Sequence, residues 1–432
     1  MNFFKKIYCR AFQFCFHVAL PFLPYREPEI LDHMGKVAEL FKNKKISRVL
    51  IVTDKGVSSL GLMDKLLFEL TAKEISYFIY DETVTNPTIS NIEAARKLYI
   101  ENDCQAIIGF GGGSSMDCAK VTAARIAKPR QSVSKMKGRL KILHKLPLLV
   151  AVPTTAGTGS ETTLAAVITD DKTHHKYPIN DFSLIPRYAV LDPQVTLGLP
   201  QHLTATTGMD ALTHAVEAYI GGSTTRHTRA MAEEAVTLIS KYLLRAYIDG
   251  NDWVARENML RASYCAGIAF TQSYVGYVHG LAHALGGQYG IPHGFANAVI
   301  LPHMLEEYDS SCHKRLAKLA RICNIADKKD NNSLAAERFI SWVKKMNCTM
   351  NIPVYIDGIQ DKDIPTMARH ADKECNPLYP VPKLMNAAQL ARMYDKISGK
   401  EHGIIKPLKS RIVSGKESVS EKKSVSRKAA SL

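Results

Sequence analysis

The sequence predicts an α/β half followed by an all-α half. Between residues 47 and 191, four short runs rich in β-branched residues are typical of buried strands, at 48–53, 76–80, 106–110 and 148–152. Helix-like segments such as 91–101 lie between these runs. After Leu199 the strand signals nearly vanish, and long Ala/Leu-rich segments with helical periodicity follow. This order predicts a Rossmann-like, largely parallel sheet with crossover helices, and then a helical domain.

The N-terminal segment, residues 1–30, has the pattern of a basic amphipathic helix. Its apolar residues are Phe3, Phe4, Ile7, Tyr8, Ala11, Phe12, Phe14, Cys15 and Val18, and its polar stripe is Lys6, Arg10, Gln13 and His17. The apolar run is too short to span a bilayer, which takes about 20 apolar residues, and no small-residue cleavage site follows it. Two roles stay open for this segment: packing against its own protein, or lying in a membrane interface.

A glycine-rich turn, GFGGGSSMDCAK, follows the third predicted strand and opens a helix. Gly111, Gly112 and Gly113 leave room for a diphosphate to approach the backbone, and the helix N-terminus offers unpaired N–H groups. Ser114 and Ser115 add hydroxyl donors. Glycine clusters often only make turns, and the pattern is not GxGxxG. The turn alone is therefore a weak signal of nucleotide binding.

A second polar loop, PTTAGTGSETT, follows the fourth predicted strand. Hydroxyls from Thr154, Thr155, Thr158 and Ser160 suit contacts to phosphate, ribose or a carboxamide. The alternative is simple helix capping by Thr158 or Ser160. Two such loops after successive strands favour a cofactor cleft at the carboxyl ends of the sheet.

Four candidate metal ligands lie in the helical half. Asp210 and His214 stand four apart in a segment with helical periodicity, so both project from one face. His279 and His283 repeat this spacing, and His293 follows. A single histidine is most often a core or surface residue. One carboxylate and three imidazoles together can hold Fe or Zn, with a position left open for a substrate oxygen.

We expect a glycine-rich turn, formed by Gly286, Gly287 and Gly290, to bring His293 toward the other ligands.

Composition excludes several classes of protein. The chain has 432 residues with 46% hydrophobic content, enough for two or three domains with a sizeable core. Part of its formal charge of +15 lies in a Ser-rich tail, residues 406–432, which we expect to be disordered. No nucleic-acid-binding module accompanies this charge. The nine cysteines are scattered without a CxxC pair, which predicts a reducing cytoplasm.

The motifs GGGSSMDCAK, PTTAGTGSE, MDALTHAVEAY and HGLAHALGGQYGIPHGFANAVILPH together resemble the iron-containing (group III) alcohol dehydrogenases. The resemblance runs in colinear order from about residue 45 to 397. It implies a nucleotide-binding domain at 31–199, a helical metal-binding domain at 200–405, and an active-site cleft between them. By motif position, it implies the metal ligands Asp210, His214, His279 and His293.

The resemblance also implies cofactor and substrate residues. Asp54 would accept from the 2′-hydroxyl of the adenosine ribose and repel a 2′-phosphate, which favours NAD over NADP. His283 would lie near the metal, either as a proton relay or as a group that positions its neighbours, and Phe270 would line the substrate pocket. The implied nucleotide contacts are Asp54, Asn86, Gly112, Gly113, Ser114, Asp117, Thr154, Thr155 and Lys176.

The function expected on these grounds is reversible hydride transfer between NAD(H) and a primary alcohol or aldehyde. Fe(II) rests on the resemblance alone, because Zn(II) suits the same ligands. Two alternatives stay open: a related NAD- and metal-using enzyme of the dehydroquinate synthase type, and a catalytically silent scaffold of the same fold. A homo-oligomer, with a dimer as the default, is the expected assembly. The expected location is the cytoplasm, with membrane contact through residues 1–30 left open.

Overall fold

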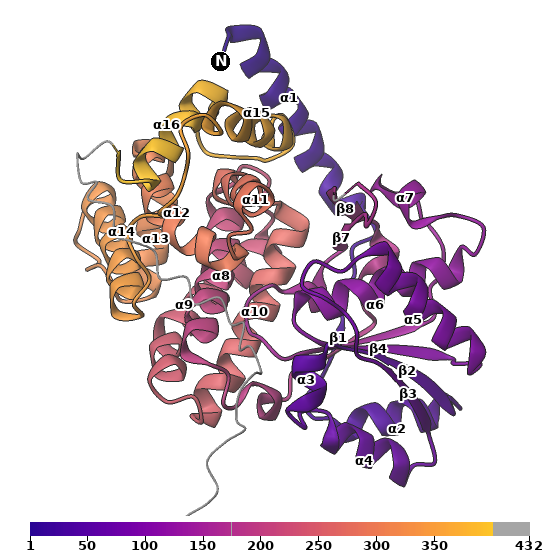
Figure 1. The fold of residues 1–432 in the computed structure, drawn as a ribbon. Coiled ribbons are helices and arrows are strands. Elements are labelled where there is room, and N and C mark those ends of the chain that lie inside the picture. Colours follow the sequence, from indigo (N-terminus) through magenta and orange to yellow (C-terminus); the bar gives the residue numbers. More distant parts are fainter. Residues whose placement is uncertain (174, 401–432) are drawn as a thin grey trace, which may run out of the picture.

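The computed structural model describes residues 1–173 and 175–400. Two halves lie side by side, an α/β half formed by the first part of the chain and a helical half formed by the second (Figure 1). The predicted fold class, a parallel-sheet domain followed by a helical domain, is confirmed. The predicted tail at 406–432 lies outside the described residues.

The sheet of the first half has six strands in the order β1-β9-β6-β4-β2-β3, and all its pairings are parallel. The four predicted strands correspond to β2 (Arg48–Val52), β3 (Ser76–Tyr80), β4 (Ala106–Gly111) and β6 (Leu148–Pro153). Sequence periodicity missed β1 (Glu29–Leu31) and β9 (Tyr188–Val190), which pair with each other. Strands of three residues are too short to give a pattern of their own.

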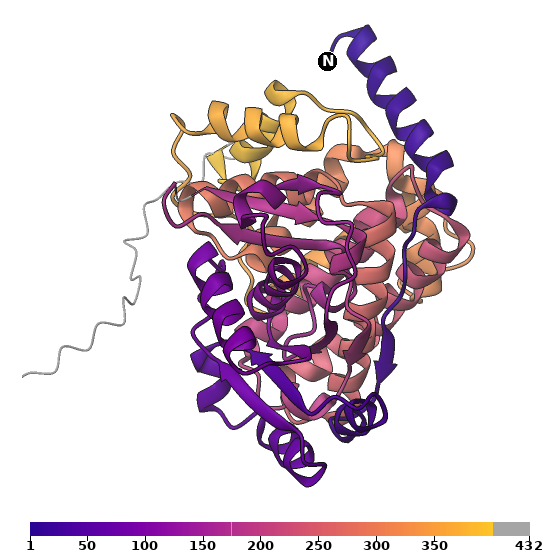
Figure 2. The same cartoon turned by 90° about the vertical axis from the view of Figure 1, so that its right-hand side faces the viewer.

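Helices cover both faces of this sheet (Figures 1 and 2). One face carries α2 (Gly35–Asn43), α3 (Lys55–Ser59) and α4 (Asp64–Ala72); the other carries α5 (Ile89–Glu101), α6 (Gly113–Ala127) and α7 (Val133–Met136). The chain leaves β2 toward the first face and its neighbour β4 toward the second. Their carboxyl ends therefore diverge and leave a crevice, the place where sheets of this kind bind ligands.

A smaller sheet of three strands shares a core with α6. Its strands are β5 (Gly138–Arg139), β7 (Ala165–Thr169) and β8 (Lys176–Asn180). Four short 3₁₀ helices, at 20–22, 160–162, 182–184 and 193–196, complete the connections of the first half.

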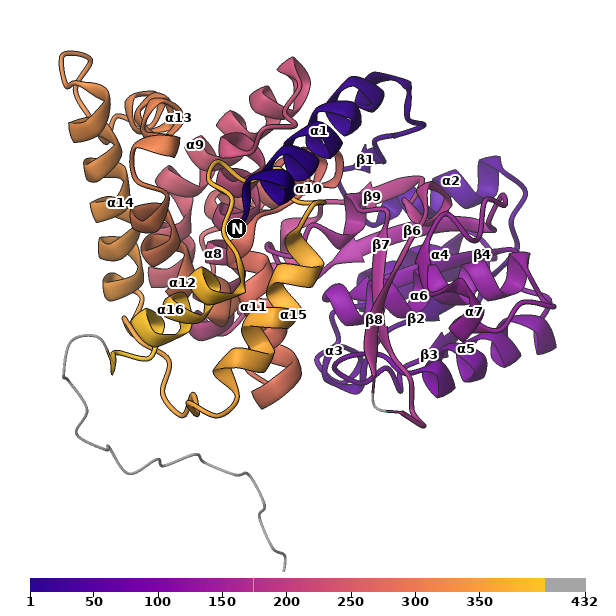
Figure 3. The same ribbon diagram turned by 90° about the horizontal axis from the view of Figure 1, so that it is seen from above.

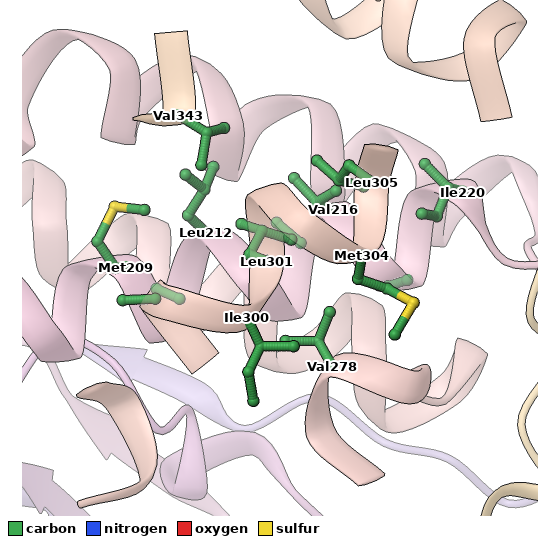
Figure 4. Close-up of a cluster of buried hydrophobic side chains, with 14 of the residues drawn as sticks. Met209, Leu212, Val216, Ile220, Val278, Ile300, Leu301, Met304, Leu305 and Val343 are labelled. Atoms are coloured by element: carbon green, nitrogen blue, oxygen red, sulfur yellow. The ribbon is translucent and has the colours of Figure 1, made fainter. Parts of the chain in front are cut away.

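The helical half is built around α8 (Gln201–Ile220), which is buried at every residue from Gly208 to Ile220. A helix that is buried all round belongs at the centre of a core. Figure 4 shows its side chains Met209, Leu212 and Val216 among residues of α11 (Tyr277–Tyr289) and α12 (His293–Tyr308). The surrounding helices are α9 (Arg226–Ile248), α10 (Trp253–Ser273), α13 (Ser310–Ile322), α14 (Asn332–Thr349), α15 (Ile364–Cys375) and α16 (Ala387–Ile397).

The N-terminal segment forms helix α1 (Phe3–Ala19), which lies across the top of the helical half in Figure 3. Cys9 and Gln13 are buried against the protein, whereas the large apolar residues of the opposite side are exposed. Cys9 belongs to the core of the helical half, and the ring of Phe16 lies 5.0 Å from that of Tyr274. The helix therefore packs against its own protein, which is one of the two roles that the sequence left open, and the membrane role stays a prediction. Among the described residues, no helix combines the length and the apolar character needed to cross a bilayer.

The predicted glycine turn before His293 is only partly correct. Gly286 and Gly287 lie inside α11, and only Gly290 adopts a left-handed conformation, with φ of 68° at the end of that helix. Buried Leu281 and Leu285 pack into the core, and this packing keeps the chain helical at the two glycines that follow. Packing therefore outweighs the low helix propensity of glycine here.

The loop after β6 joins the two halves by close backbone contacts. A Cβ atom on Gly157 would lie 2.6 Å from the carbonyl oxygen of Thr207 in α8. A Cβ atom on Gly159 would lie 2.8 Å from the Cα of Gly267 in α10. Only glycine permits such an approach. The loop thus fixes the carboxyl end of the sheet against the helical half.

We expect Gly157→Ala to lower the melting temperature, because the new methyl group displaces the backbone of α8 at a cost of about 1–3 kcal/mol. Gly287→Ala is the matched control: this exposed helical glycine has nothing within 4 Å of its Cβ position. The control should stabilise the protein by up to about 1 kcal/mol. Thermal unfolding measures both, and a Gly157→Ala protein that melts at or above the wild-type temperature would contradict this packing.

Candidate active site

Four side chains from three helices converge beside the crevice. Asp210 and His214 project from one side of α8, His279 comes from the first turn of α11, and His293 is the first residue of α12. Each offers one ligand atom, and these four atoms all lie within 4.8 Å of one another. The rings of His214 and His279 are 4.5 Å apart between centroids. This donor set and size fit a single transition-metal ion.

The cluster holds more acceptors than donors. The side-chain amide of Asn297 lies 2.7 Å from Asp210 Oδ1, 3.2 Å from His279 Nε2 and 3.1 Å from His293 Nε2. One amide group has two hydrogens for these three acceptors. Asp210 is only 2% exposed, and a buried carboxylate needs a compensating positive charge. A bound cation would satisfy both requirements.

The imidazoles of the cluster favour the neutral state in which they can bind a metal. Burial lowers the pKa of His214 to about 4 and that of His293 to about 3. Burial also holds the pKa of His279 well below its usual value. Removing a cationic form from water is unfavourable, so these rings keep a free lone pair at neutral pH.

Glu217 orients one of these rings, and sequence reasoning missed it. Its buried carboxylate accepts from the imidazole Nδ1 of His279 at 2.6 Å and from the backbone N–H groups of Gly276 and Val278 at 2.8 Å each. Burial raises the pKa of Glu217 to about 7, and the backbone donors oppose that shift. A proton held on Nδ1 leaves Nε2 of His279 free to face the cluster. The helical spacing of Asp210, His214 and Glu217 was the sequence feature that could have identified Glu217.

His283 lies one turn beyond His279 at the solvent side of the cluster. Its side chain is 42% exposed, and its ring stacks 5.1 Å from that of His293. Nδ1 of His283 is 2.7 Å from Glu374, which also accepts from the hydroxyl of Tyr379 at 2.7 Å. Burial opposes the positive charge on His283, but the attraction and hydrogen bond of Glu374 raise its pKa overall. Sequence reasoning gave no sign of Glu374 or Tyr379.

Phe270, predicted to line the substrate pocket, stacks on a candidate ligand. Its ring on α10 lies 4.1 Å from that of His214, with 13° between the planes. It forms an apolar wall beside the cluster.

The glycine-rich turn lines a cavity of about 630 Å³ at the carboxyl ends of β2 and β4. Asp54, Gly112, Gly113 and Ser114 are among its lining residues. Asp54 caps α3 by accepting from the N–H of Val57 at 3.0 Å, and its second oxygen accepts from the Ser115 hydroxyl at 3.0 Å. The predicted ribose-binding acid and the predicted diphosphate turn therefore share one cavity.

Asn86 and Lys176 lie between this cavity and the histidine cluster. The Lys176 ammonium donates to Asn86 Oδ1 at 2.5 Å, and the backbone N–H of Asn86 is 3.4 Å from the Ser114 hydroxyl. Burial lowers the pKa of Lys176. Its charge also helps to lower the pKa of His293. Lys176 therefore acts electrostatically on the cluster.

The second predicted loop faces the first. Both carboxylate oxygens of Asp117 hold protein groups, the Ser160 hydroxyl and the Val167 N–H, each at 2.8 Å. Thr154 of this loop is buried, and a Cβ atom on Gly112 would lie 3.9 Å from the Thr155 hydroxyl. That hydroxyl is buried and has no hydrogen-bond partner within the described part of the chain. An unsatisfied buried hydroxyl between two loops suits a ligand group.

Comparison with known proteins identifies the family. The family described as iron-containing alcohol dehydrogenase matches residues 31–193, and its C-terminal family matches residues 204–398. Alcohol dehydrogenase 4 of Schizosaccharomyces pombe is 38% identical over 355 residues, which cover 80% of this chain and 83% of that protein.

Two solved structures share the fold over most of both chains. A 1,3-propanediol oxidoreductase has a TM-score of 0.82 and 34% identity, covering 86% of this chain and 98% of its own. A sulfoacetaldehyde reductase from Bifidobacterium kashiwanohense, solved in complex with NAD⁺, has a TM-score of 0.77 and 25% identity, covering 87% and 98%. The chain belongs to the iron-containing alcohol dehydrogenase family, and it is an oxidoreductase that interconverts alcohols and aldehydes.

Proposed function

We propose that the protein is an NAD(H)-dependent dehydrogenase that acts on small primary alcohols and their aldehydes, with Fe(II) at the histidine cluster. The observation that carries this proposal is the cluster itself: Asp210, His214, His279 and His293 offer ligand atoms within 4.8 Å of one another. They stand near two loops suited to a dinucleotide. The apolar wall of Phe270 supports a small uncharged substrate.

The family supports a metal and NAD(H), and the donor set fits both Fe(II) and Zn(II). When bound, the metal supplies Lewis acidity toward a substrate oxygen, and the nicotinamide supplies or takes the hydride. We assign Asp54, Asn86, Gly112, Gly113, Ser114, Asp117, Thr154, Thr155 and Lys176 to the nucleotide site. Asp117 acts there through Ser160 and the backbone of Val167, which its two carboxylate oxygens bind.

The side chains around the cluster orient its imidazole rings and transfer the proton of the substrate. Glu217 holds the ring of His279 in one orientation, and Phe270 keeps water from one side of His214. We assign proton transfer between substrate and solvent to His283, because it is half exposed and bonded to Glu374.

The two alternatives left open by the sequence are less well supported. The relatives are named as alcohol dehydrogenases and a propanediol oxidoreductase, which does not favour a lyase of the dehydroquinate synthase type. A catalytically silent scaffold gives no reason for a buried cluster rich in acceptors, nor for an unsatisfied buried hydroxyl between the two predicted cofactor loops. The dimer, the cytoplasmic location and the domain limits stay predictions.

We expect purified protein loaded with Fe(II) to oxidise NADH when mixed with short aldehydes, and chelation to abolish this activity. His279→Ala should contain less than about a tenth of the metal that the wild-type protein binds, and it should lose turnover, because one of the four proposed ligands is missing. His303→Ala is the matched control, since His303 bonds only the Val354 carbonyl within the described structure, at 3.0 Å. Metal analysis and NADH absorbance measure both. Full metal content in His279→Ala would reject the site, and turnover after Zn(II) loading alone would reassign the metal.

Asp54→Asn should raise the ratio of kcat/KM with NADPH to that with NADH by about tenfold, or 1.4 kcal/mol, because a charge that repels a 2′-phosphate is removed. The asparagine keeps an oxygen for the N–H of Val57, so the cap of α3 is preserved. Glu82→Gln removes a charge from the rim of the same cavity and serves as the control. An unchanged cofactor ratio in Asp54→Asn would exclude Asp54 from the ribose site.

His283→Ala should lower kcat by about a hundredfold or more while the metal content stays at the wild-type level. This combination separates a proton-transfer group from a metal ligand. Steady-state kinetics and metal analysis on the same preparation provide the readout. Wild-type kcat in this variant would reject the catalytic role, and parallel loss of metal would place His283 among the ligands.

A further inference from the structure

Helix α1 presents an exposed apolar face on the side opposite to its protein contacts. Its buried residues are Cys9 and Gln13. Its large exposed residues are Phe3 (70% exposed), Phe4 (80%), Ile7 (52%), Tyr8 (59%), Phe14 (67%) and Val18 (51%), and Phe22 (85%) follows just after the helix. At about 100° per residue they occupy an arc of about 140°. We call these seven residues the outer face.

Polar contacts fix the helix with this face outward. Arg10 donates to the carbonyl oxygens of Val381 and Pro382, each at 2.8 Å. Gln13 donates to the carbonyl oxygen of Tyr379 at 2.7 Å, and Lys5 pairs with Asp372 of α15 at 3.0 Å. Rolling the outer face inward would break these bonds and leave the backbone carbonyl groups that accept them without their donors. The exposure of the outer face is therefore built into the fold.

The position of α1 leaves the outer face accessible. Figures 1 and 2 both show α1 at one extremity of the molecule, with its first turns projecting beyond the neighbouring helices. Its 17 residues make a rod of about 25 Å, which is long enough to lie along a surface. A contiguous exposed apolar patch of this kind marks a binding surface.

The charge around the outer face selects its partner. Residues 1–26 contain Lys5, Lys6, Arg10 and Arg26 and no acidic residue, so the segment keeps a net positive charge after Lys5 pairs with Asp372. A second copy would bring the same cations and no carboxylate from this segment to pair with them, which disfavours self-association through identical faces. Anionic phospholipid head groups complement this charge, and acyl chains accept the aromatic side chains.

We propose that the outer face of α1 docks the enzyme on an anionic membrane surface. The helix lies parallel to the bilayer, its Phe side chains enter the boundary between head groups and acyl chains, and Lys6 lies beside that contact. The helix does not cross the bilayer, and the enzyme body stays in water. The proposal is independent of the metal and nucleotide assignments, because it uses none of their residues.

The test is flotation of the full-length protein with vesicles of phosphatidylcholine alone or mixed with phosphatidylglycerol. Wild-type protein should float with the mixed vesicles, and raised salt should reduce its bound fraction. Phe4→Glu/Phe14→Glu should lower the bound fraction by at least about tenfold, and Lys6→Glu should lower it less. Phe68→Glu is the matched control, because Phe68 on α4 is 71% exposed and lies on the sheet half.

All variants should keep wild-type turnover and melting temperature in vesicle-free solution, which shows that the fold is intact. Equal flotation of the double variant and wild type would overturn the proposal. Failure of the wild-type protein to float would also overturn it. Equal binding of the wild-type protein to neutral and to mixed vesicles would overturn the assignment of an anionic surface as the partner. Sedimentation equilibrium tests the other occupant: a wild-type dimer and a monomeric double variant, without vesicle binding, would assign the outer face to a second copy.

Discussion

The complete burial of α8 is the constraint on which the candidate site depends. Every residue from Gly208 to Ile220 is buried, so the helix cannot turn or slide without losing contacts on all sides. Asp210 and His214 therefore keep a fixed separation. Glu217, one turn further, reaches across to the start of α11 and holds both its backbone and the ring of His279. One helix thus supplies two candidate ligands and positions a third.

Burial also determines the electrostatics of the cleft. The helical half contributes a carboxylate and neutral imidazoles, which together present an excess of acceptors. The sheet half contributes glycine N–H positions, hydroxyls and the ammonium of Lys176. A cation fits the first set, and the N–H and hydroxyl donors of the second set suit the phosphate and ribose groups of a dinucleotide. This division explains why the site lies at the junction and in neither half alone.

Much of the fold follows from local pattern, and the missing parts depend on distant partners. The long strands and the shared face of Asp210 and His214 obey simple periodicities, which a single sequence displays. The helical state of Gly286 and Gly287 was missed because core packing overrides propensity. Glu217 was missed although it lies on the same helix, because its partner His279 is 62 residues away. The amphipathic pattern of α1 likewise defines two faces but not which one meets the protein.

The contact between Gly157 and Thr207 has a consequence for the motion of the two halves. Backbone atoms already meet there with no space for a methyl group, and Thr207 stands one turn before Asp210 on α8. Van der Waals surfaces are nearly incompressible at such distances. The contact therefore sets a lower limit to the distance between the two halves at this point. No motion of the two halves can bring them closer at this point than they already lie.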